Sequence, residues 1–321
     1  MKAHNFLIVF SLALILLLTA TGCGQPASSA AGDGPAGTIT ISGAWALYPL
    51  VVRWGEEYQA LYPGVKFDIS AGGAGKGMAD ALSNAVDIGM VSREIHPAEV
   101  EKGAFGVPVA KDAVFATVSE KNPVLTELLQ QGVPRQTFID IFITGQVTTW
   151  GQVTGQPQET SPIHVFTRSD AAGAPATWAE YLGGQQEDLR GVGVYGDPGL
   201  LEAVIKDPLG IGFNNLNYVF DMETEQFVPG IRIIPIDVNE NGRADPEEVY
   251  TTKVEAVAGV GNGYYPSPPA RDLYLVTAGQ PTGLIKDFIR WVLTEGQKYV
   301  DEAGYVELPQ TKLDKALATL E

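Results

Sequence analysis

Short β-type runs alternate with helical runs from residue 38 onward, and this alternation limits the possible folds more than any other feature of the chain. Residues 38–42, 65–70 and 86–91 are rich in β-branched and apolar side chains, whereas residues 50–61 repeat large apolar side chains at helical spacing. Glycine or proline separates several of these runs. Strands that alternate with helices are typical of βαβ units, so the sequence predicts an α/β fold with a mainly parallel sheet.

The chain is predicted to leave this first group of elements and to return to it near its end. The apolar run 107–119 is long enough to cross between two lobes, and the β-type run 273–277 would cross back. We expect lobe I to comprise residues 38–114 and 271–321, lobe II to comprise residues 115–270, and a ligand cleft to lie between them. The further expected elements are helices at 134–142, 171–182 and 281–303, the last as one long amphipathic helix, and strands at 165–168, 211–213 and 231–236.

The N-terminal residues have the pattern of a targeting signal. Within residues 1–22, Lys2 precedes an apolar run of about a dozen residues. This run is shorter than the hydrophobic segment that a membrane-spanning helix needs. The run ends in small residues at Cys23, which resembles a bacterial lipoprotein signal with Cys23 as the lipidated mature N-terminus. The alternative is a plain secretory signal followed by an unused thiol. Residues 23–37 lack large apolar side chains and read as a flexible tether, so we expect an extracytoplasmic, lipid-anchored protein in a periplasm or at a cell surface.

Composition excludes several classes of protein. The chain has 38 acidic and 21 basic residues, a net charge of −17, whereas a nucleic-acid-binding protein needs a basic face. Its single cysteine permits no intramolecular disulfide bond and no cysteine-based zinc site. No Gly-x-Ser-x-Gly sequence occurs, and His96 and His164 lie in unremarkable contexts. We therefore expect a monomer that is not an enzyme.

Several short motifs follow one another in a fixed order along about residues 38–310. They are Ile41-Ser42-Gly43, the glycine loop 72–77, 87–93, 145–150, Thr167-Arg168-Ser169-Asp170, Ile211-Gly212-Phe213, Arg271-Asp272-Leu273-Tyr274, Pro281-Thr282-Gly283 and Gly304-Tyr305-Val306. Together they resemble the substrate-binding protein of phosphate-type ABC transporters. The resemblance implies a two-lobed type II periplasmic-binding-protein fold that captures phosphate or a related small anion and delivers it to an ABC permease.

The resemblance also implies a ligand site built largely from helix N-termini, which present free N–H groups and the positive end of the helix dipole. The implied ligand-binding residues are Ala44, Trp45, Ala46, Gly73, Ala74, Gly75, Ser92, Arg93, Arg168, Ala172, Gly173 and Ala174. Arginines could add forked hydrogen bonds to an anion. Other interpretations stay open: Arg168 pairs with Asp170, Arg93 is a surface or hinge residue, and the glycine loop is only a tight connection.

The chain departs from the phosphate-binding pattern at the positions where relatives place hydroxyl groups. The loop 43–46 reads Gly-Ala-Trp-Ala, and alanines also stand at 74, 172 and 174. Hydrogen bonds to a charged group contribute about 1.5–3 kcal/mol each, so their loss would weaken phosphate binding by orders of magnitude. The ligand could instead be another oxyanion, a carboxylate or a larger molecule stacked on Trp45, unless Trp45 only packs. The alternative function is a sensing or surface lipoprotein that has lost tight phosphate binding.

A second motif predicts a metal site. Residues 237–248 match the twelve-residue EF-hand loop, with Gly242 at the sixth position. The oxygen ligands would be Asp237, Asn239, Asn241, the main-chain carbonyl of Arg243, Asp245 and Glu248. The sequence therefore predicts bound Ca²⁺ in a structural role; the alternative is an acidic surface turn.

Overall fold

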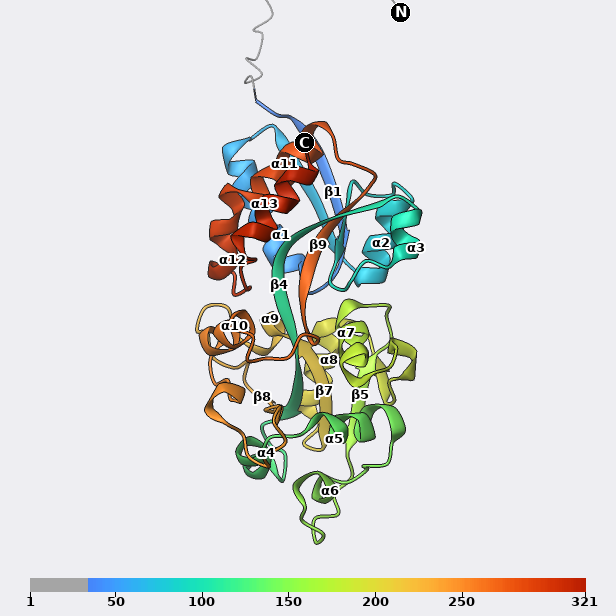
Figure 1. Cartoon of the computed structure of the whole chain (residues 1–321), viewed down its shortest axis with the longest axis vertical. Coiled ribbons are helices and arrows are strands. Elements are labelled where there is room, and N and C mark those ends of the chain that lie inside the picture. The colour runs from blue at the N-terminus through green and yellow to red at the C-terminus, as the bar shows by residue number, and fades with distance from the viewer. Residues whose placement is uncertain (1–33) are drawn as a thin grey trace, which may run out of the picture. The chain divides into compact units, whose positions relative to one another are not determined.

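The computed structural model describes residues 34–321 (Figure 1). Two separate hydrophobic cores form within these residues. The first core takes its buried residues from 39–110 and 273–320. The second takes them from 113–270, together with Val306. The two cores divide close to the boundaries expected at 114 and 271, although Ala113, Val114 and Val306 belong to the second core. Those boundaries stay predictions, because Pro35–Glu321 form one compact unit. The signal peptide, Cys23 and most of the expected tether lie outside the described residues.

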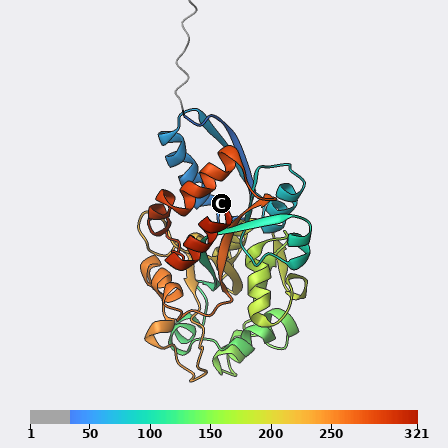
Figure 2. The ribbon, with the colours of Figure 1, turned by 45° about the horizontal axis from the view of Figure 1, so that its top comes forward.

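Lobe I, which surrounds the first core, is a small α/β layer in which β1 pairs in parallel with both β2 and β3. One face of α1 buries Leu50, Val51, Trp54 and Tyr58, which is the helical repeat seen in the sequence. C-terminal helices pack on the same lobe, and Figure 2 shows them in orange and red close to α1. Its elements are β1 (Gly37–Gly43), α1 (Tyr48–Leu61), β2 (Val65–Ala71), α2 (Ala74–Leu82), β3 (Ile88–Val91), α3 (Pro97–Glu101), α11 (Gly283–Leu293), α12 (Lys298–Glu302) and α13 (Gln310–Thr319).

Two long strands connect the lobes. They are β4 (Ala104–Ser119), which was predicted as the crossing segment, and β9 (Ala270–Ala278). The two strands pair antiparallel, and their register places Asp112 opposite Arg271 (Figure 1). Movement between the lobes would therefore pass through this pair of strands.

Lobe II surrounds the second core and adds three strands on one side of β4, in the order β7, β5 and β6. A fourth strand, β8, pairs separately with β4. The elements of this lobe are α4 (Leu125–Gln131), α5 (Arg135–Ile139), a π-helical turn (Asp140–Thr144), α6 (Trp150–Thr154), β5 (His164–Arg168), α7 (Gly173–Leu182), β6 (Val192–Val194), α8 (Gly196–Lys206), β7 (Gly210–Asn215), α9 (Leu216–Val219), β8 (Ile231–Ile233) and α10 (Lys253–Gly261).

The sheet is not mainly parallel, so that prediction is wrong. β3 and β4 both pair antiparallel with β9, and β4 pairs antiparallel with β7 and β8. Parallel pairing is confined to the βα units within each lobe. The crossing strands run against their neighbours because one of them leaves lobe I and the other returns to it.

The single long helix expected at 281–303 is also wrong. α11 ends at Leu293, and Thr294 has φ −118° and ψ −98°, outside the helical region. A short 3₁₀ turn (Glu295–Gln297) and α12 follow. The carbonyl of Gly296 accepts a hydrogen bond from the buried Trp54 indole at 2.8 Å, so tertiary packing overrides the helical repeat.

None of the helices in residues 34–321 combines the length and the apolar character that a membrane crossing requires.

Candidate ligand-binding cleft

The N-termini of two helices, one from each lobe, meet between the lobes. The main-chain N–H of Gly75, in the first turn of α2, donates to the carbonyl of Ala171, just before α7, at 3.0 Å. Neither N-cap residue, Gly73 or Ala172, caps its helix with its own side chain, and neither helix carries an acidic residue in its first turn. At α7, the N–H of Ala172 donates to Oε1 of Gln186 at 3.2 Å. The positive ends of both helix dipoles therefore face one place, which suits a negatively charged or oxygen-rich group.

Glycine permits this close approach. Gly73 has φ 92°, and a Cβ there would lie 2.7 Å from the Ala171 carbonyl oxygen. A Cβ on Gly75 would lie 2.8 Å from the Ala171 Cβ. A Cβ on Gly173 would overlap both the side-chain and the main-chain oxygen of Ser92. The glycine loop is thus a site of contact between lobes and not only a tight connection.

Most of the predicted alanines do not point their side chains at a ligand. Ala44, Ala46 and Ala74 belong to the lobe I core, and Ala174 belongs to the lobe II core. Some of their main-chain groups are also engaged within the protein: the N–H of Ala44 donates to the carbonyl of Met90, and the carbonyl of Ala46 accepts from Tyr305.

Trp45 reaches across to lobe II. Its ring packs edge-on against Tyr195, with the ring centroids 6.2 Å apart, and its carbonyl accepts from the Tyr218 hydroxyl at 3.2 Å. A Cβ on Gly196 would lie 3.3 Å from the Trp45 ring. The structure therefore gives Trp45 a packing role between the lobes.

Arg168 is buried and paired with two carboxylates. Its Nε and Nη2 donate to Asp170 at 2.8 and 2.6 Å, and its Nη1 donates to Asp197 at 2.5 Å. Burial acts to lower the pKa of Arg168, but Asp197 and Asp170 outweigh it and hold that pKa above its usual value. The pairing with Asp170 left open by the sequence is present, and Asp197 is a partner that the sequence did not reveal.

A buried polar chain continues from Arg168 to the crossing strands. The second oxygen of Asp197 accepts from the Asn215 side-chain amide at 2.8 Å, and the Asn215 Oδ1 accepts from Arg271. Nη2 of Arg271 lies 3.4 Å from Asp112 Oδ2. Burial raises the pKa of Asp112 from 3.8 to about 6, although Arg271 acts to lower it. This series of buried polar contacts links the cleft to the strands that join the lobes.

Sequence reasoning missed three members of this hydrogen-bonded network, Asp112, Asp197 and Asn215. It gave a fourth member, Arg271, no role in the site. Asp112 is a lone acid in an apolar run, Asp197 follows Gly196 at a helix start, and Arg271 belongs to a motif that was quoted only for the resemblance. A lone acid in a buried strand needs a basic or hydrogen-bonding partner, which is a signal that could have identified Asp112. Asn215 carries no such signal.

Arg93 is also engaged with the protein itself. Its guanidinium makes two hydrogen bonds to Glu99, at 2.7 and 2.9 Å, and a third to the Glu94 carbonyl. Glu99 additionally accepts from the main-chain N–H of His96, so the ion pair also closes the start of α3. Arg93 thus has no unpaired charge to offer an anion in this conformation.

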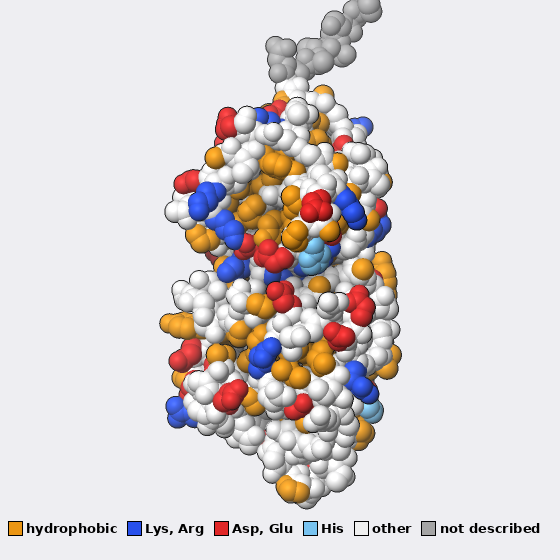
Figure 3. Space-filling view, turned by 45° about the vertical axis from the view of Figure 1, so that its right-hand side comes forward, with side chains coloured by type: hydrophobic (Ala, Val, Ile, Leu, Met, Phe, Trp, Pro, Cys, Tyr) orange, Lys and Arg blue, Asp and Glu red, His pale blue; other side chains and the backbone are white. Residues whose placement is uncertain are grey.

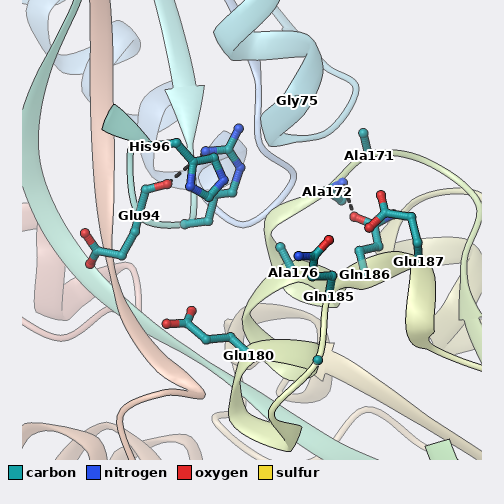
Figure 4. A pocket seen from close by; sticks show the side chains of 12 residues that line it. Gly75, Glu94, His96, Ala171, Ala172, Ala176, Glu180, Gln185, Gln186 and Glu187 are labelled. Atoms are coloured by element: carbon teal, nitrogen blue, oxygen red, sulfur yellow. Dashed lines mark hydrogen bonds between the residues drawn. The ribbon is translucent and has the colours of Figure 1, made fainter. Parts of the chain in front are cut away.

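Arg93 borders a pocket of about 520 Å³ that opens between the lobes beside both helix N-termini. Figure 4 shows Glu94 and His96 on one side of it and Glu180, Gln185 and Gln186 on the other. Figure 3 shows charged side chains of both signs gathered at this boundary. The pocket is larger than a single small oxyanion needs and lies in the size range of small organic ligands.

The predicted calcium loop lies in lobe II, between β8 and α10. Its last residues form a short 3₁₀ turn, Pro246–Glu248. Strand β8 ends at Ile233 rather than at residue 236, so three residues separate it from the loop. All six predicted ligand residues lie within this one loop, away from the cleft.

Comparison with known proteins gives one family. Residues 28–295 match the family model described as a PBP superfamily domain. The phosphate-binding protein PstS of Bacillus subtilis (strain 168) is 24% identical over 322 residues, which cover 97% of each chain. The protein of the same name from Pseudomonas aeruginosa PAO1 is 26% identical and covers 95% of this chain and 97% of its own.

Two solved structures share the fold. A putative phosphate ABC transporter substrate-binding protein from Clostridium perfringens, with bound phosphate, is 23% identical with a TM-score of 0.69 and covers 85% of this chain and 100% of its own. An ABC-type phosphate transport receptor from Vibrio cholerae is 20% identical with a TM-score of 0.62, covering 84% and 100%. The predicted two-lobed α/β fold is confirmed.

Proposed function

The chain belongs to the PBP superfamily, and we propose that it is an extracytoplasmic receptor that captures phosphate or a related oxyanion between its lobes for an ABC importer. The observation that carries this proposal is the meeting of two helix N-termini from opposite lobes, at Gly75 and Ala171, with no acidic residue in the first turn of either helix. The names of the relatives matched over nearly the whole chain support phosphate as the ligand and an ABC permease as the partner. This function is capture and delivery rather than catalysis.

The ligand contacts in this proposal are mainly main-chain N–H groups. Arg168 is neutralised by Asp170 and Asp197, and Arg93 by Glu99, so neither arginine adds net positive charge. Helix N-termini can hold an oxyanion without a basic side chain. We therefore expect phosphate to bind more weakly than it would in a site that also supplies several hydroxyl groups. A sensing or surface role without transport is not favoured, because the named relatives are phosphate-binding proteins.

The proposal places the protein at a membrane through a lipid on Cys23, with residues 24–37 as the tether and the folded part as a monomer. Mass spectrometry of the purified chain is expected to show that residues 1–22 are lost and that Cys23 carries a lipid. The Cys23→Ser variant should leave the membrane fraction. Retention of that variant in the membrane would contradict the anchor.

Calorimetric titration of the full-length chain in detergent, with phosphate and then with sulfate, tests the capture of an oxyanion. Gly173→Ala is the informative variant, because the added methyl group would overlap Ser92 and hold the lobes apart. Overpacking of this kind typically costs about 1–3 kcal/mol, so we expect phosphate to bind about tenfold more weakly or worse. Gly261→Ala is the matched control, since its Cβ would meet only Val306 at an ordinary 3.5 Å.

Two results would count against the proposal. If neither phosphate nor any other small oxyanion gives a binding signal with the unmodified chain, the proposed function is wrong. If phosphate binds and Gly173→Ala binds it equally well, the ligand lies elsewhere than between Ser92 and Gly173.

A further inference from the structure

We propose that residues 237–248 form a calcium-binding site that is independent of the cleft. The spacing of the loop fits the EF-hand pattern at every ligand position, and Gly242 has φ 77° at the sharp turn. Spacing alone would also suit an acidic surface turn. The structure adds two observations that favour a cation.

The first observation is the burial of carboxylates without basic partners. Asp237 is 3% exposed and Glu248 is 6% exposed. Within residues 34–321, no Lys, Arg or His nitrogen lies within 4.0 Å of either carboxylate. Arg243 pairs with Asp245 at 2.9 Å, but its side chain is 74% exposed. Main-chain N–H groups donate to both carboxylates, but no positive charge of the described residues balances them. Buried charges are normally paired or bound to a metal, so this unbalanced negative charge favours a cation.

The second observation is that three side chains converge on one point. The side-chain amide nitrogens of Asn239 and Asn241 both lie 2.8 Å from Oδ2 of Asp245. The amide oxygens now accept from the main-chain N–H groups of Asn241 and Arg243. A half-turn of each amide would give up these bonds, exchange its nitrogen for its oxygen and bring three oxygens together. Only a cation would stabilise that arrangement, and oxygen ligands are those that Ca²⁺ prefers.

The site depends on more than acidic side chains. No group of three or more Asp, Glu, His or Cys residues between 34 and 321 is arranged to hold a metal by itself. Calcium takes six to eight oxygens, so asparagine oxygens and the Arg243 carbonyl must complete the set. A smaller ion such as Mg²⁺, which demands octahedral geometry and keeps its waters, fits this mixed set less well.

The loop is fastened to the rest of lobe II, which gives a bound ion a structural role. The N–H of Asp237 donates to the Val133 carbonyl at 3.1 Å, and the N–H of Ala244 donates to the Gln130 carbonyl at 2.9 Å. Glu248 accepts from the N–H groups of Val238 and Asp245, and so joins the two ends of the loop. Calcium would stiffen the connection between β8, α4 and α10 without touching the anion site.

The test is calorimetric titration of the full-length chain, stripped with chelator, using CaCl₂ and MgCl₂ separately. We expect one calcium site and much weaker magnesium binding. Glu248 is a proposed direct ligand, and even a change in an outer partner of a ligand commonly lowers affinity 10–100-fold, so Glu248→Gln should weaken calcium binding about tenfold or more. Glu247→Gln is the matched control, because Glu247 is the adjacent, exposed residue at a position that supplies no ligand.

Asn241→Ala provides a second variant at an exposed position, in case Glu248→Gln does not fold. It should weaken calcium binding and leave phosphate binding unchanged. Absence of calcium binding at millimolar concentration would overturn the proposal. Equal calcium affinity in the unmodified chain and in Asn241→Ala would also overturn it, because the ion would then bind elsewhere.

Discussion

The cleft and the loop 237–248 each bury three carboxylates, but they balance the charge differently. In the cleft, Asp112, Asp170 and Asp197 face the buried Arg168 and Arg271. In the loop, the exposed Arg243 pairs with Asp245, and no basic side chain of residues 34–321 pairs with Asp237 or Glu248. The chain therefore supplies its own cations where the lobes meet, whereas in the loop the proposed calcium ion would balance the charge.

This difference in charge balance indicates how each region would bind its proposed ligand. The cleft arginines are already paired, so an oxyanion must be held by helix N-termini rather than by net positive charge. The loop has excess negative charge and buried oxygens, so it favours a divalent cation. The predictions below separate the two cases, from the largest expected effect to the smallest.

Arg168→Met should lower the free energy of unfolding most. It removes the guanidinium from two buried carboxylates, and breaking a buried ion pair in this way costs about 3–5 kcal/mol. Urea denaturation measures the change. The control is Arg53→Met, because the half-exposed Arg53 pairs with Glu57 on one helix and should contribute less than about 1 kcal/mol. Equal losses of unfolding free energy in the two variants would show that the buried ion pairs of Arg168 stabilise the fold no more than a surface pair does.

Asp112→Asn should change how stability depends on pH. The pKa of Asp112 is raised from 3.8 to about 6, so the folded chain holds this proton more tightly than the unfolded chain. The stability that the protonated carboxyl contributes is present below about pH 4 and is lost as pH rises to about 6. At about 1.36 kcal/mol per pKa unit, the loss is on the order of 3 kcal/mol.

Urea denaturation of the unmodified chain and of Asp112→Asn between those pH values measures this effect as a difference. The unmodified chain should lose stability relative to the variant as pH rises. A difference that stays constant over the range would show that Asp112 does not titrate there.

Calcium should stabilise the unmodified chain more than Glu248→Gln. A ligand at one hundred times its dissociation constant raises the free energy of unfolding by about 2.7 kcal/mol. Thermal melting in calcium and in chelator measures the gain for each chain. A gain of equal size in Glu248→Gln would indicate that calcium acts at another place.

Arg243→Ala should have the smallest effect on stability. An exposed ion pair contributes about 0–1 kcal/mol, so melting in chelator should hardly change. Calcium affinity should rise instead, because the variant removes a positive charge that competes for Asp245. Weaker calcium binding in Arg243→Ala would mean that the arginine side chain supports the site.

Much of the fold could be predicted from local patterns. The βα units of lobe I and the crossing strand β4 follow from runs of apolar residues whose spacing depends only on the element that holds them. The break in the C-terminal helix could not be predicted, because it depends on Trp54, which is 242 residues away in the sequence from Gly296. The antiparallel pairing of β4 and β9 likewise depends on how two distant segments meet.

The candidate site was predictable in part. The glycine loop meets Ala171, and Gly173 meets Ser92, because glycines mark places where two backbones approach closely. The partners of Arg168 were only half foreseen: Asp170 lies two residues away in the sequence, whereas Asp197 lies in helix α8. Asn215 has neither charge nor motif to mark it, so only the three-dimensional structure identifies its place between Asp197 and Arg271.

Hydrogen exchange of the full-length chain with and without phosphate tests the central claim most directly. If an oxyanion is held by the N-termini of α2 and α7, phosphate will slow exchange in the segments 73–77 and 172–176 together, and will do so much less in Gly173→Ala. Protection confined to one of these segments, or absent from both at saturating phosphate, would contradict capture between the two lobes.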